Sequence, residues 1–282
     1  MNILISGSHG LVGTALLTSL EEEGHQVARL GRDFARPIAF EGIDAVIHLA
    51  GESIAEGRWN AAKKERIERS RVDGTTELSR LIAESSHKPR VFISASAIGY
   101  YGDRSDEKLS EKSEPGSGFL PAVCAKWEAA TRPAEEAGVR VVKLRTGIVL
   151  STQGGALNKM LFPFKMGGGG VLGSGQQYMS WISLDDMIGA IRFLLFDSSL
   201  EGPVNLVAPN AVTNHEFTKT LGKALGRPTV MPMPAFAARL LFGEMADALL
   251  LSSARVVPEK LSEAGYAFTH RDLQSALEDI LE

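Results

Sequence analysis

The first half of the chain alternates short apolar runs with longer stretches in which apolar residues recur every three or four positions. Short apolar runs are typical of buried strands, and the longer pattern is typical of amphipathic helices. The alternation therefore predicts βαβ units on a parallel sheet. The predicted strands are 2–6, 26–30, 45–49, 91–94 and 140–144. The predicted helices are 11–23, 61–84 and 121–136, and Pro133 should kink the last one or end it early.

The pattern changes beyond Leu150. Residues 151–180 are rich in glycine, with an unbroken run from Gly167 to Gly170, and this composition predicts a mobile loop. A helix over 184–196 and a strand over 204–207 then return to the sheet, and the chain from Thr213 onward is mostly helical. The fold class expected is α/β, a Rossmann doubly wound parallel sheet with a smaller, mostly helical C-terminal substrate lobe. Residues 1–152 and 180–207 would form the Rossmann domain, and 153–179 and 208–282 the lobe.

Composition narrows the function classes. The chain has 282 residues, of which 44% are hydrophobic and 23% charged, so a disordered or fibrous protein is excluded. The net charge of −4, with scattered Lys and Arg, argues against a nucleic-acid partner. The single cysteine, Cys124, suits a reducing compartment. The apolar run at the start is too short for a signal peptide, and no stretch is long enough for a membrane span. We therefore expect a cytoplasmic protein with no membrane partner.

A glycine-rich turn follows the first predicted strand. Residues 7–13 read GSHGLVG, a G-x-x-G-x-x-G spacing between a strand and a helix. Glycine permits the tight turn, lets backbone N–H groups approach a pyrophosphate, and packs the helix against the strand. The helix N-terminus adds a partial positive charge. The turn predicts dinucleotide contacts at these positions: Gly7, Ser8, Gly10, Leu11, Val12 and Gly13.

The end of the second strand distinguishes NAD from NADP. An NAD site places Asp or Glu there to bind the ribose 2′-hydroxyl, but this strand ends Leu30-Gly31-Arg32-Asp33. Gly31 leaves room for a 2′-phosphate, and Arg32 can bind that phosphate through two hydrogen bonds. Asp33 is an alternative ribose ligand from a later position. The pattern favours NADP(H) over NAD.

Further motifs resemble the extended short-chain dehydrogenases/reductases. Residues 44–52 (DAVIHLAGE) are similar to the strand and turn that cover the adenine side of the cofactor, and 93–102 (ISASAIGYYG) to the active-site serine strand. The chain is identified as a member of the atypical, epimerase-like subgroup related to NAD-dependent epimerase/dehydratases. In bacteria this group is labelled nucleoside-diphosphate-sugar epimerase or cell division inhibitor. The motifs that carry this resemblance are 67–71 (IERSR), 126–128 (KWE), 145–150 (RTGIVL), 173–176 (GSGQ), 180–182 (SWI), 258–261 (PEKL) and the terminal helix 273–281.

The resemblance implies additional site residues. Ala50 and Gly51 would lie along the adenosine half of the cofactor, and Arg71 would be a polar contact near the nucleotide. The superfamily uses a Tyr-x-x-x-Lys pair with a serine, in which the lysine also binds the nicotinamide ribose. Here Lys126 matches the lysine and Ser96 the serine. Ala122 stands where the tyrosine would be.

Two alternatives could replace the missing tyrosine as the proton donor or acceptor. Tyr101, or as a second choice Tyr100, follows the serine strand and could supply the phenol. Alternatively the chemistry needs no tyrosine, and water or a group of the substrate supplies the proton. The candidate catalytic residues are therefore Ser96, Tyr101 and Lys126. Cys124 has no histidine near it in sequence and is interpreted as a buried packing residue, as is His48. The six histidines show no metal-ligand spacing, so no metal site is expected.

Three functions are compatible with these residues. The first is an NADP(H)-dependent oxidoreductase or epimerase that acts on a small carbonyl, alcohol or nucleotide-sugar substrate. The second is an NADPH-binding regulatory protein without turnover, suggested by Ala122. The third is a scaffold that acts only through protein contacts, and the intact glycine turn argues against it. The sequence leaves both a monomer and a homodimer open.

Overall fold

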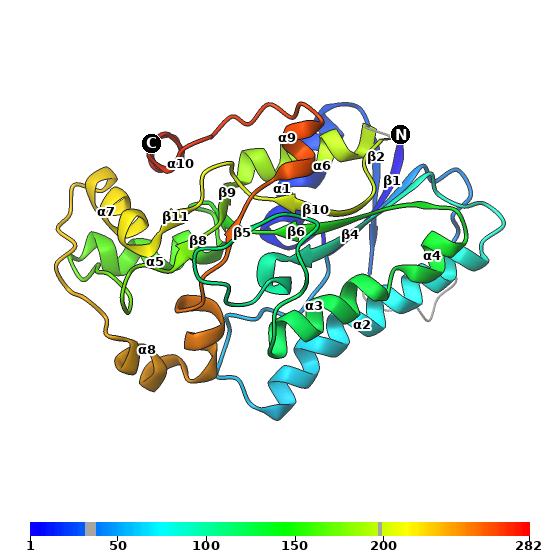
Figure 1. Cartoon of the computed structure of the whole chain (residues 1–282). Coiled ribbons are helices and arrows are strands. Elements are labelled where there is room, and N and C mark those ends of the chain that lie inside the picture. Colours follow the sequence, from blue (N-terminus) through cyan, green and yellow to red (C-terminus); the bar gives the residue numbers. More distant parts are fainter. Residues whose placement is uncertain (32–37, 197–198) are drawn as a thin grey trace.

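The computed structural model describes residues 1–31, 38–196 and 199–282, and its centre is a six-stranded parallel sheet (Figure 1). The strands lie in the order β10-β6-β4-β3-β1-β2, and every neighbouring pair is parallel. Their bounds are β1 (Asn2–Ser6), β2 (Gln26–Leu30), β3 (Ala45–His48), β4 (Val91–Ala97), β6 (Arg140–Thr146) and β10 (Gly202–Leu206). The predicted Rossmann-like α/β fold is confirmed.

Helices cover both faces of this sheet, as a parallel sheet requires. On one face α1 (Leu11–Glu22) and α6 (Leu184–Phe196) share a core with Ile3, Ile5 and Ile47. On the other, α2 (Ala61–Glu84) and α4 (Arg132–Glu136) pack against Leu4 and Val46. Neighbouring residues of β1 thus point to opposite apolar cores. This explains why the strands read as continuous apolar runs.

The strand order places a topological switch point between β1 and β3. From β1 the chain passes through α1 to β2 on one side, then crosses back to β3 on the other side of β1. In open α/β sheets, ligands bind outside the carboxyl ends of the strands at such a point. The turn that follows β1 and the turn that follows β3 meet there.

The predicted helix over 121–136 is two helices. The first, α3 (Phe119–Ala129), ends before the second, α4, which begins at Arg132 with Pro133 in its first turn. Proline has no backbone N–H, so it is tolerated at a helix start and interrupts a longer helix. β4 continues three residues beyond the predicted strand 91–94, because residues 95–97 stay paired with β6.

The glycine-rich stretch 151–180 is not one mobile loop. It contains α5 (Gly155–Lys165), in which Leu157, Leu161 and Phe164 are buried, and the short strand β8 (Tyr178–Met179). The apolar residues of α5 recur at helical spacing and pack into a second core, which outweighs the local glycine content.

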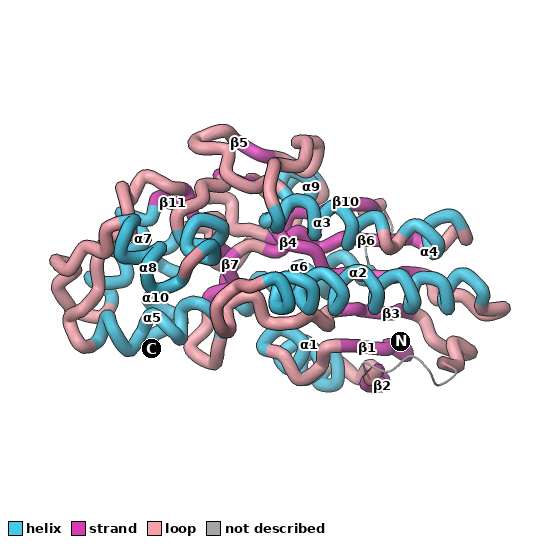
Figure 2. Tube along the Cα trace, turned by 90° about the horizontal axis from the view of Figure 1, so that it is seen from below, coloured by secondary structure: helices cyan, strands magenta, loops and turns pink. Residues whose placement is uncertain are grey.

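The remaining elements extend the molecule beyond the sheet. Helices α5, α7 (Asn214–Ala224), α8 (Ala235–Phe242) and α10 (Leu273–Leu281) gather at one end (Figure 2). The second core joins α5, α7 and α10 around Trp181 and Phe217. The other short elements are β5 (Lys108–Leu109), β7 (Ile148–Leu150), β9 (Trp181–Ser183), β11 (Val212–Thr213), β12 (Arg255–Val256), α9 (Glu259–Glu263), η1 (Ile98–Tyr100) and η2 (Ala246–Leu250). Among the described residues, no helix has the length and apolar character to span a membrane.

Candidate functional site

The turn that follows β1 is built on close backbone contacts that require glycine. Gly7 has a φ of +74°, and a Cβ there would lie 2.6 Å from the carbonyl carbon of Leu49. A Cβ on Gly13 would lie 2.2 Å from the carbonyl oxygen of Gly7. Both distances are far below a van der Waals contact. The first glycine lets the turn touch the end of β3, and the second lets α1 pack on β1.

The N-terminus of α1 points its free N–H groups at this edge of the sheet. The N-cap residue is Gly10, which makes no side-chain capping hydrogen bond, and the first turn carries no acidic residue. The N–H groups of Leu11 and Val12 therefore lack the capping partner that a helix start usually has. Backbone donors of this kind, together with the helix dipole, form a site for a phosphate group.

The end of β2 leaves space beside this turn. Gly31 follows the strand directly, and a Cβ added there would meet no described atom within 4 Å. Gly31 is therefore not needed for packing. Arg32 and Asp33 lie outside the described residues.

Arg71 lies where the turn after β3 approaches α2. A Cβ on Gly51 would be 3.3 Å from the Arg71 guanidinium carbon, and the guanidinium lies over the Trp127 ring at 5.1 Å. Nη1 of Arg71 donates to the carbonyl of Ile67 at 3.1 Å. Burial lowers the pKa of Arg71, and the structure records no ion pair to it from a described carboxylate. A half-buried cation thus lies against the Ala50-Gly51 turn, and the nearby Glu52 charge acts on it without forming an ion pair in the described part of the chain.

Ser96 takes part in a buried hydrogen-bond network. Its hydroxyl donates to Oε1 of Glu128 on α3 at 2.8 Å. The same carboxylate accepts from Arg145 of β6 twice, from Nε and Nη2, each at 2.8 Å. Arg145 is only 2% exposed. The network joins β4, α3 and β6 and holds the Ser96 hydroxyl inside the protein.

Tyr101 belongs to the same network. Its side chain is fully buried, and its hydroxyl accepts from Nη1 of Arg145 at 3.0 Å. The hydroxyl lies 2.7 Å from Oδ1 of Asn205 and 3.0 Å from the carbonyl of Ser110, so its single proton has two acceptors. Burial raises the pKa of Tyr101 to about 12. Tyr101 therefore supports the ends of β6 and β10 as a neutral phenol.

Tyr100 is more accessible than Tyr101. It is half-buried, and its ring lies 3.5 Å from the guanidinium carbon of Arg145. Burial raises its pKa as well. Of the two tyrosines, only this one keeps solvent-exposed surface.

Lys126 lies on the outer side of α3. Its side chain is 57% exposed, and Nζ forms an ion pair with Glu68 of α2 at 2.6 Å. Ala122, one turn earlier, is exposed on the same side. The structure therefore does not bring Lys126 together with Ser96 and Tyr101.

The opposite face of α3 approaches the end of β4 with apolar side chains. A Cβ on Gly99 would lie 3.5 Å from Cβ of Leu120 and 3.7 Å from Sγ of Cys124. Leu120 and Cys124 are four residues apart and share that face. Burial raises the pKa of Cys124 to about 12, so the thiol stays protonated at neutral pH. Neither side chain offers an acid or a base near neutral pH.

Glu128, Arg145 and Asn205 received no role from the sequence. Glu128 and Arg145 stand inside two of the motifs quoted above, KWE and RTGIVL. For Glu128 and Arg145, the signal in the sequence was a charged residue inside a stretch that also contains buried apolar residues. Charges are seldom buried unless they are paired.

The comparisons with known proteins agree with this architecture. Residues 3–206 match the profile described as "NAD dependent epimerase/dehydratase family", and residues 233–280 match a "Domain of unknown function (DUF1731)". This chain belongs to the epimerase/dehydratase family. The resemblance inferred from its motifs is confirmed.

Family relatives match along the whole chain. "Epimerase family protein Mb2239" of Mycobacterium bovis is 42% identical, over 98% of this chain and 96% of that protein. The human "Epimerase family protein SDR39U1" is 34% identical over the full length of both.

A crystal structure of the human protein (isoform 2) "with NADPH" superposes with a TM-score of 0.94 at 33% identity, covering 99% of both chains. A nucleoside-diphosphate sugar epimerase from Corynebacterium glutamicum superposes with a TM-score of 0.81 at 37% identity, and this chain spans 58% of it. These two related proteins thus share the Rossmann-like fold seen here.

Proposed function

We propose that this epimerase-family chain binds NADP(H) at the β1/β3 switch point. The observation that carries the proposal is the turn of residues 7–13, in which two obligatory glycines bring an uncapped helix N-terminus to the carboxyl edge of the sheet. The pyrophosphate would accept from the N–H groups of Leu11 and Val12, with Ser8 and Gly10 in the turn beside it. The human relative crystallised with NADPH supports this assignment.

The preference for NADP(H) over NAD(H) rests on the end of β2. A 2′-phosphate would occupy the space beside Gly31 and pair with Arg32, for which the sequence alone argues. Arg71, a half-buried cation beside Gly51, would bind a second anionic or ribose group of the nucleotide. Ala50 and Gly51 would cover the adenosine half.

A parallel titration with NADPH and NADH, followed by nicotinamide fluorescence, tests the cofactor. We expect NADPH to bind at least about tenfold more tightly than NADH, because one charge-assisted hydrogen bond to the 2′-phosphate contributes roughly 1.5–3 kcal/mol. Gly31→Asp should abolish the preference by placing a carboxylate against that phosphate, whereas Gly31→Ala should keep it. No binding of either nucleotide would overturn the assignment.

We further propose that the bound cofactor exchanges hydride with a small carbonyl, alcohol or nucleotide-sugar substrate. Bound NADPH would supply the hydride for reduction of the substrate carbonyl, and the carbonyl oxygen would also need a proton. Ser96, Tyr101 and Lys126 remain the sequence-based candidates for that step. The buried Tyr101 and the exposed Lys126 favour water as the proton source.

An NADPH-binding protein without turnover is the second candidate. Leu120 and Cys124, on the face of α3 against the end of β4, favour it, because that face lacks an acid or base near neutral pH. A panel of carbonyl substrates with saturating NADPH separates the two candidates. Oxidation of NADPH that depends on the added carbonyl supports the oxidoreductase, and none across the panel supports the binding protein. A cytoplasmic location and the choice between monomer and homodimer stay predictions from the sequence.

A further inference from the structure

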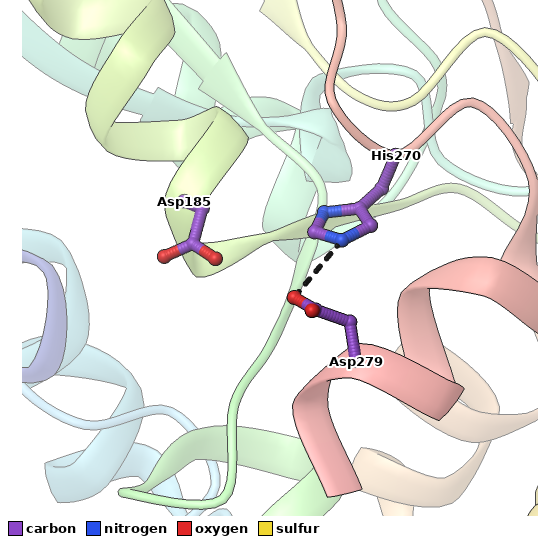
Figure 3. A group of neighbouring side chains, drawn as sticks. All are labelled: Asp185, His270 and Asp279. Carbon is purple, nitrogen blue, oxygen red and sulfur yellow. Dashed lines mark ion pairs between the residues drawn. The ribbon is translucent and has the colours of Figure 1, made fainter. Parts of the chain in front are cut away.

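Two carboxylates and one histidine meet where the C-terminal segment returns to α6 (Figure 3). Asp185 lies in the first turn of α6, His270 precedes α10, and Asp279 lies in the last turn of α10. One potential ligand atom from each residue lies within 4.8 Å of the other two. The cluster is remote in sequence from the glycine turn and from the Ser96 network.

His270 is held rigidly in this cluster. It is only 5% exposed, and its backbone N–H donates to Oδ2 of Asp186 at 2.8 Å. Its Nδ1 lies 2.9 Å from the hydroxyl of Ser183, and that hydroxyl donates to Asp186 at 3.2 Å. Nδ1 also lies 3.8 Å from Oδ2 of Asp186, so a proton on Nδ1 would face the oxygens of both Ser183 and Asp186. In that tautomer the lone pair is on Nε2, the atom that faces Asp279.

Nε2 and the Asp279 carboxylate are placed to share a proton or a metal ion. The two atoms are 3.2 Å apart, and with the lone pair on Nε2 the contact is favourable only when a cation lies between them. Asp279 also carries its charge in the last turn of α10, where the helix dipole opposes it and where no basic residue stands. Either a proton on Nε2 or a metal ion would remove both conflicts.

Asp185 adds a third potential ligand, which a metal ion can use and a proton on Nε2 cannot. Its exposed carboxylate adds a second negative charge to the same cluster, with no hydrogen bond or ion pair from another described side chain. A proton on Nε2 can be donated along only one direction, toward Asp279. A divalent cation can bind Nε2 and both carboxylates at once.

We propose that Asp185, His270 and Asp279 form a site for a divalent transition metal of the zinc class. Imidazole nitrogen with carboxylate oxygen suits such ions, and three protein ligands with water as the fourth form a common tetrahedral shell. Ser183 acts as the outer partner that fixes the tautomer of the histidine ligand. Both carboxylates are exposed, so they can rotate to bonding distances of about 2.0–2.2 Å. The bound ion joins the start of α6 to α10.

Ligand spacing in the sequence hides this site. Asp185 lies more than eighty residues before His270, and Asp279 follows His270 on the next helix. A search for histidines at short spacing therefore predicts no metal site. Only the return of the chain to α6 brings the ligands together.

Thermal unfolding of the tag-free full chain, treated with chelator and then titrated with Zn²⁺, tests the proposal. We expect one ion to bind by calorimetry and the Tm to rise by about 5 °C when free Zn²⁺ is about 100 times the Kd. Asp185→Asn and Asp279→Asn should each remove most of this rise. Glu278→Gln, a neighbouring carboxylate on α10, is the matched control and should keep it. Co²⁺ in place of Zn²⁺ should give the visible absorption of a tetrahedral site, and Asp279→Asn should lose it.

Two results would overturn the metal site. An unchanged Tm of the natural chain at saturating Zn²⁺ would leave only a His270–Asp279 ion pair, and Asp279→Asn would then lower the Tm equally with and without metal. A rise that survives both Asp185→Asn and Asp279→Asn would place the ion elsewhere on the surface.

Discussion

Arg145 and Glu128 show how single residues stabilise this fold without taking part in a predicted reaction. Arg145 donates to Glu128 and Tyr101 from the end of β6, inside the protein. Taking both charges out of water is costly, and the two parallel hydrogen bonds offset that cost only while both partners are present. The pair is therefore sensitive to the loss of either member.

Glu128→Ala should lower the free energy of unfolding by about 3–5 kcal/mol, because it leaves the Arg145 charge buried without its partner. Urea denaturation measures the change. Lys126→Ala, on the same helix, is the control: its pair with Glu68 is exposed, so the loss should be at most about 1 kcal/mol. Equal effects of the two substitutions would contradict this account of the network.

Arg71 offers a sharper test of the nucleotide site. Arg71→Ala should weaken NADPH binding by about 10- to 100-fold, since a charge-assisted hydrogen bond contributes roughly 1.5–3 kcal/mol. Fluorescence titration of NADPH measures this. Arg69, two residues away on α2, is exposed and pairs with Asp73, so Arg69→Ala should leave the affinity unchanged. An unaltered affinity of Arg71→Ala would remove Arg71 from the site.

At the scale of elements, the direction in which α3 faces matters more than its composition. Ala122 and Lys126 share the outward side, whereas Leu120 and Cys124 share the side that meets Gly99. Both pairs have the i, i+4 spacing that the family's motif uses. A shift of two residues along a helix rotates the side chain by about 200°, because each residue turns it by about 100°. Spacing alone cannot choose between the two faces.

The start of α10 gives a pH-dependent prediction for one element. The N-cap Asp272 accepts from the N–H of Ser275, and this hydrogen bond lowers the pKa of Asp272 below its ordinary value of 3.8. The carboxylate form thus binds fewer protons in the folded state, so its stabilisation is present above pH 3.8 and is lost as the pH falls through the lowered pKa.

Asp272→Ala should therefore destabilise the protein by about 1 kcal/mol at neutral pH. The difference from the natural chain should shrink in acid. Tm measured from neutral pH down to the acid-unfolding region checks both parts. A difference that is constant with pH would show that Asp272 does not stabilise α10 through its charge.

At the scale of the whole molecule, Asp186 holds the C-terminal segment against the sheet. Its buried carboxylate accepts from Tyr266, from the backbone N–H groups of Thr269 and His270, and from Ser183. Three of these donors come from the segment after α9. A single side chain at the start of α6 thus fixes how that segment returns toward α6.

Asp186→Ala should cost at least about 3 kcal/mol, because several buried donors lose their acceptor. Amide hydrogen exchange should rise over residues 264–282 well before it rises in the central sheet. Asp185→Asn in chelator, one residue away and exposed, should show neither effect. Uniform exchange throughout the molecule would mean that the segment does not open separately.

The sequence by itself determined the sheet and the cofactor turn. Strands buried on both faces must be apolar throughout, and amphipathic helices must repeat every 3.6 residues, so both are visible locally. The bounds predicted for β1, β2, α2 and α6 agree with the structure. Gly7 and Gly13 could be assigned in advance, because the glycine spacing between a strand and a helix is itself a local signal, although Gly7 makes its close contact with Leu49 of another segment.

Only the tertiary structure decided what each polar side chain faces. α5 forms within a glycine-rich stretch because the second core, built from distant helices, buries its apolar residues. Ser96 donates to Glu128 and Tyr101 accepts from Arg145, partners that lie more than thirty residues away, and Lys126 pairs with α2. Asp185, His270 and Asp279 meet only because the chain returns to α6. Each of these depends on contacts between distant residues, and local periodicity carries no record of such contacts.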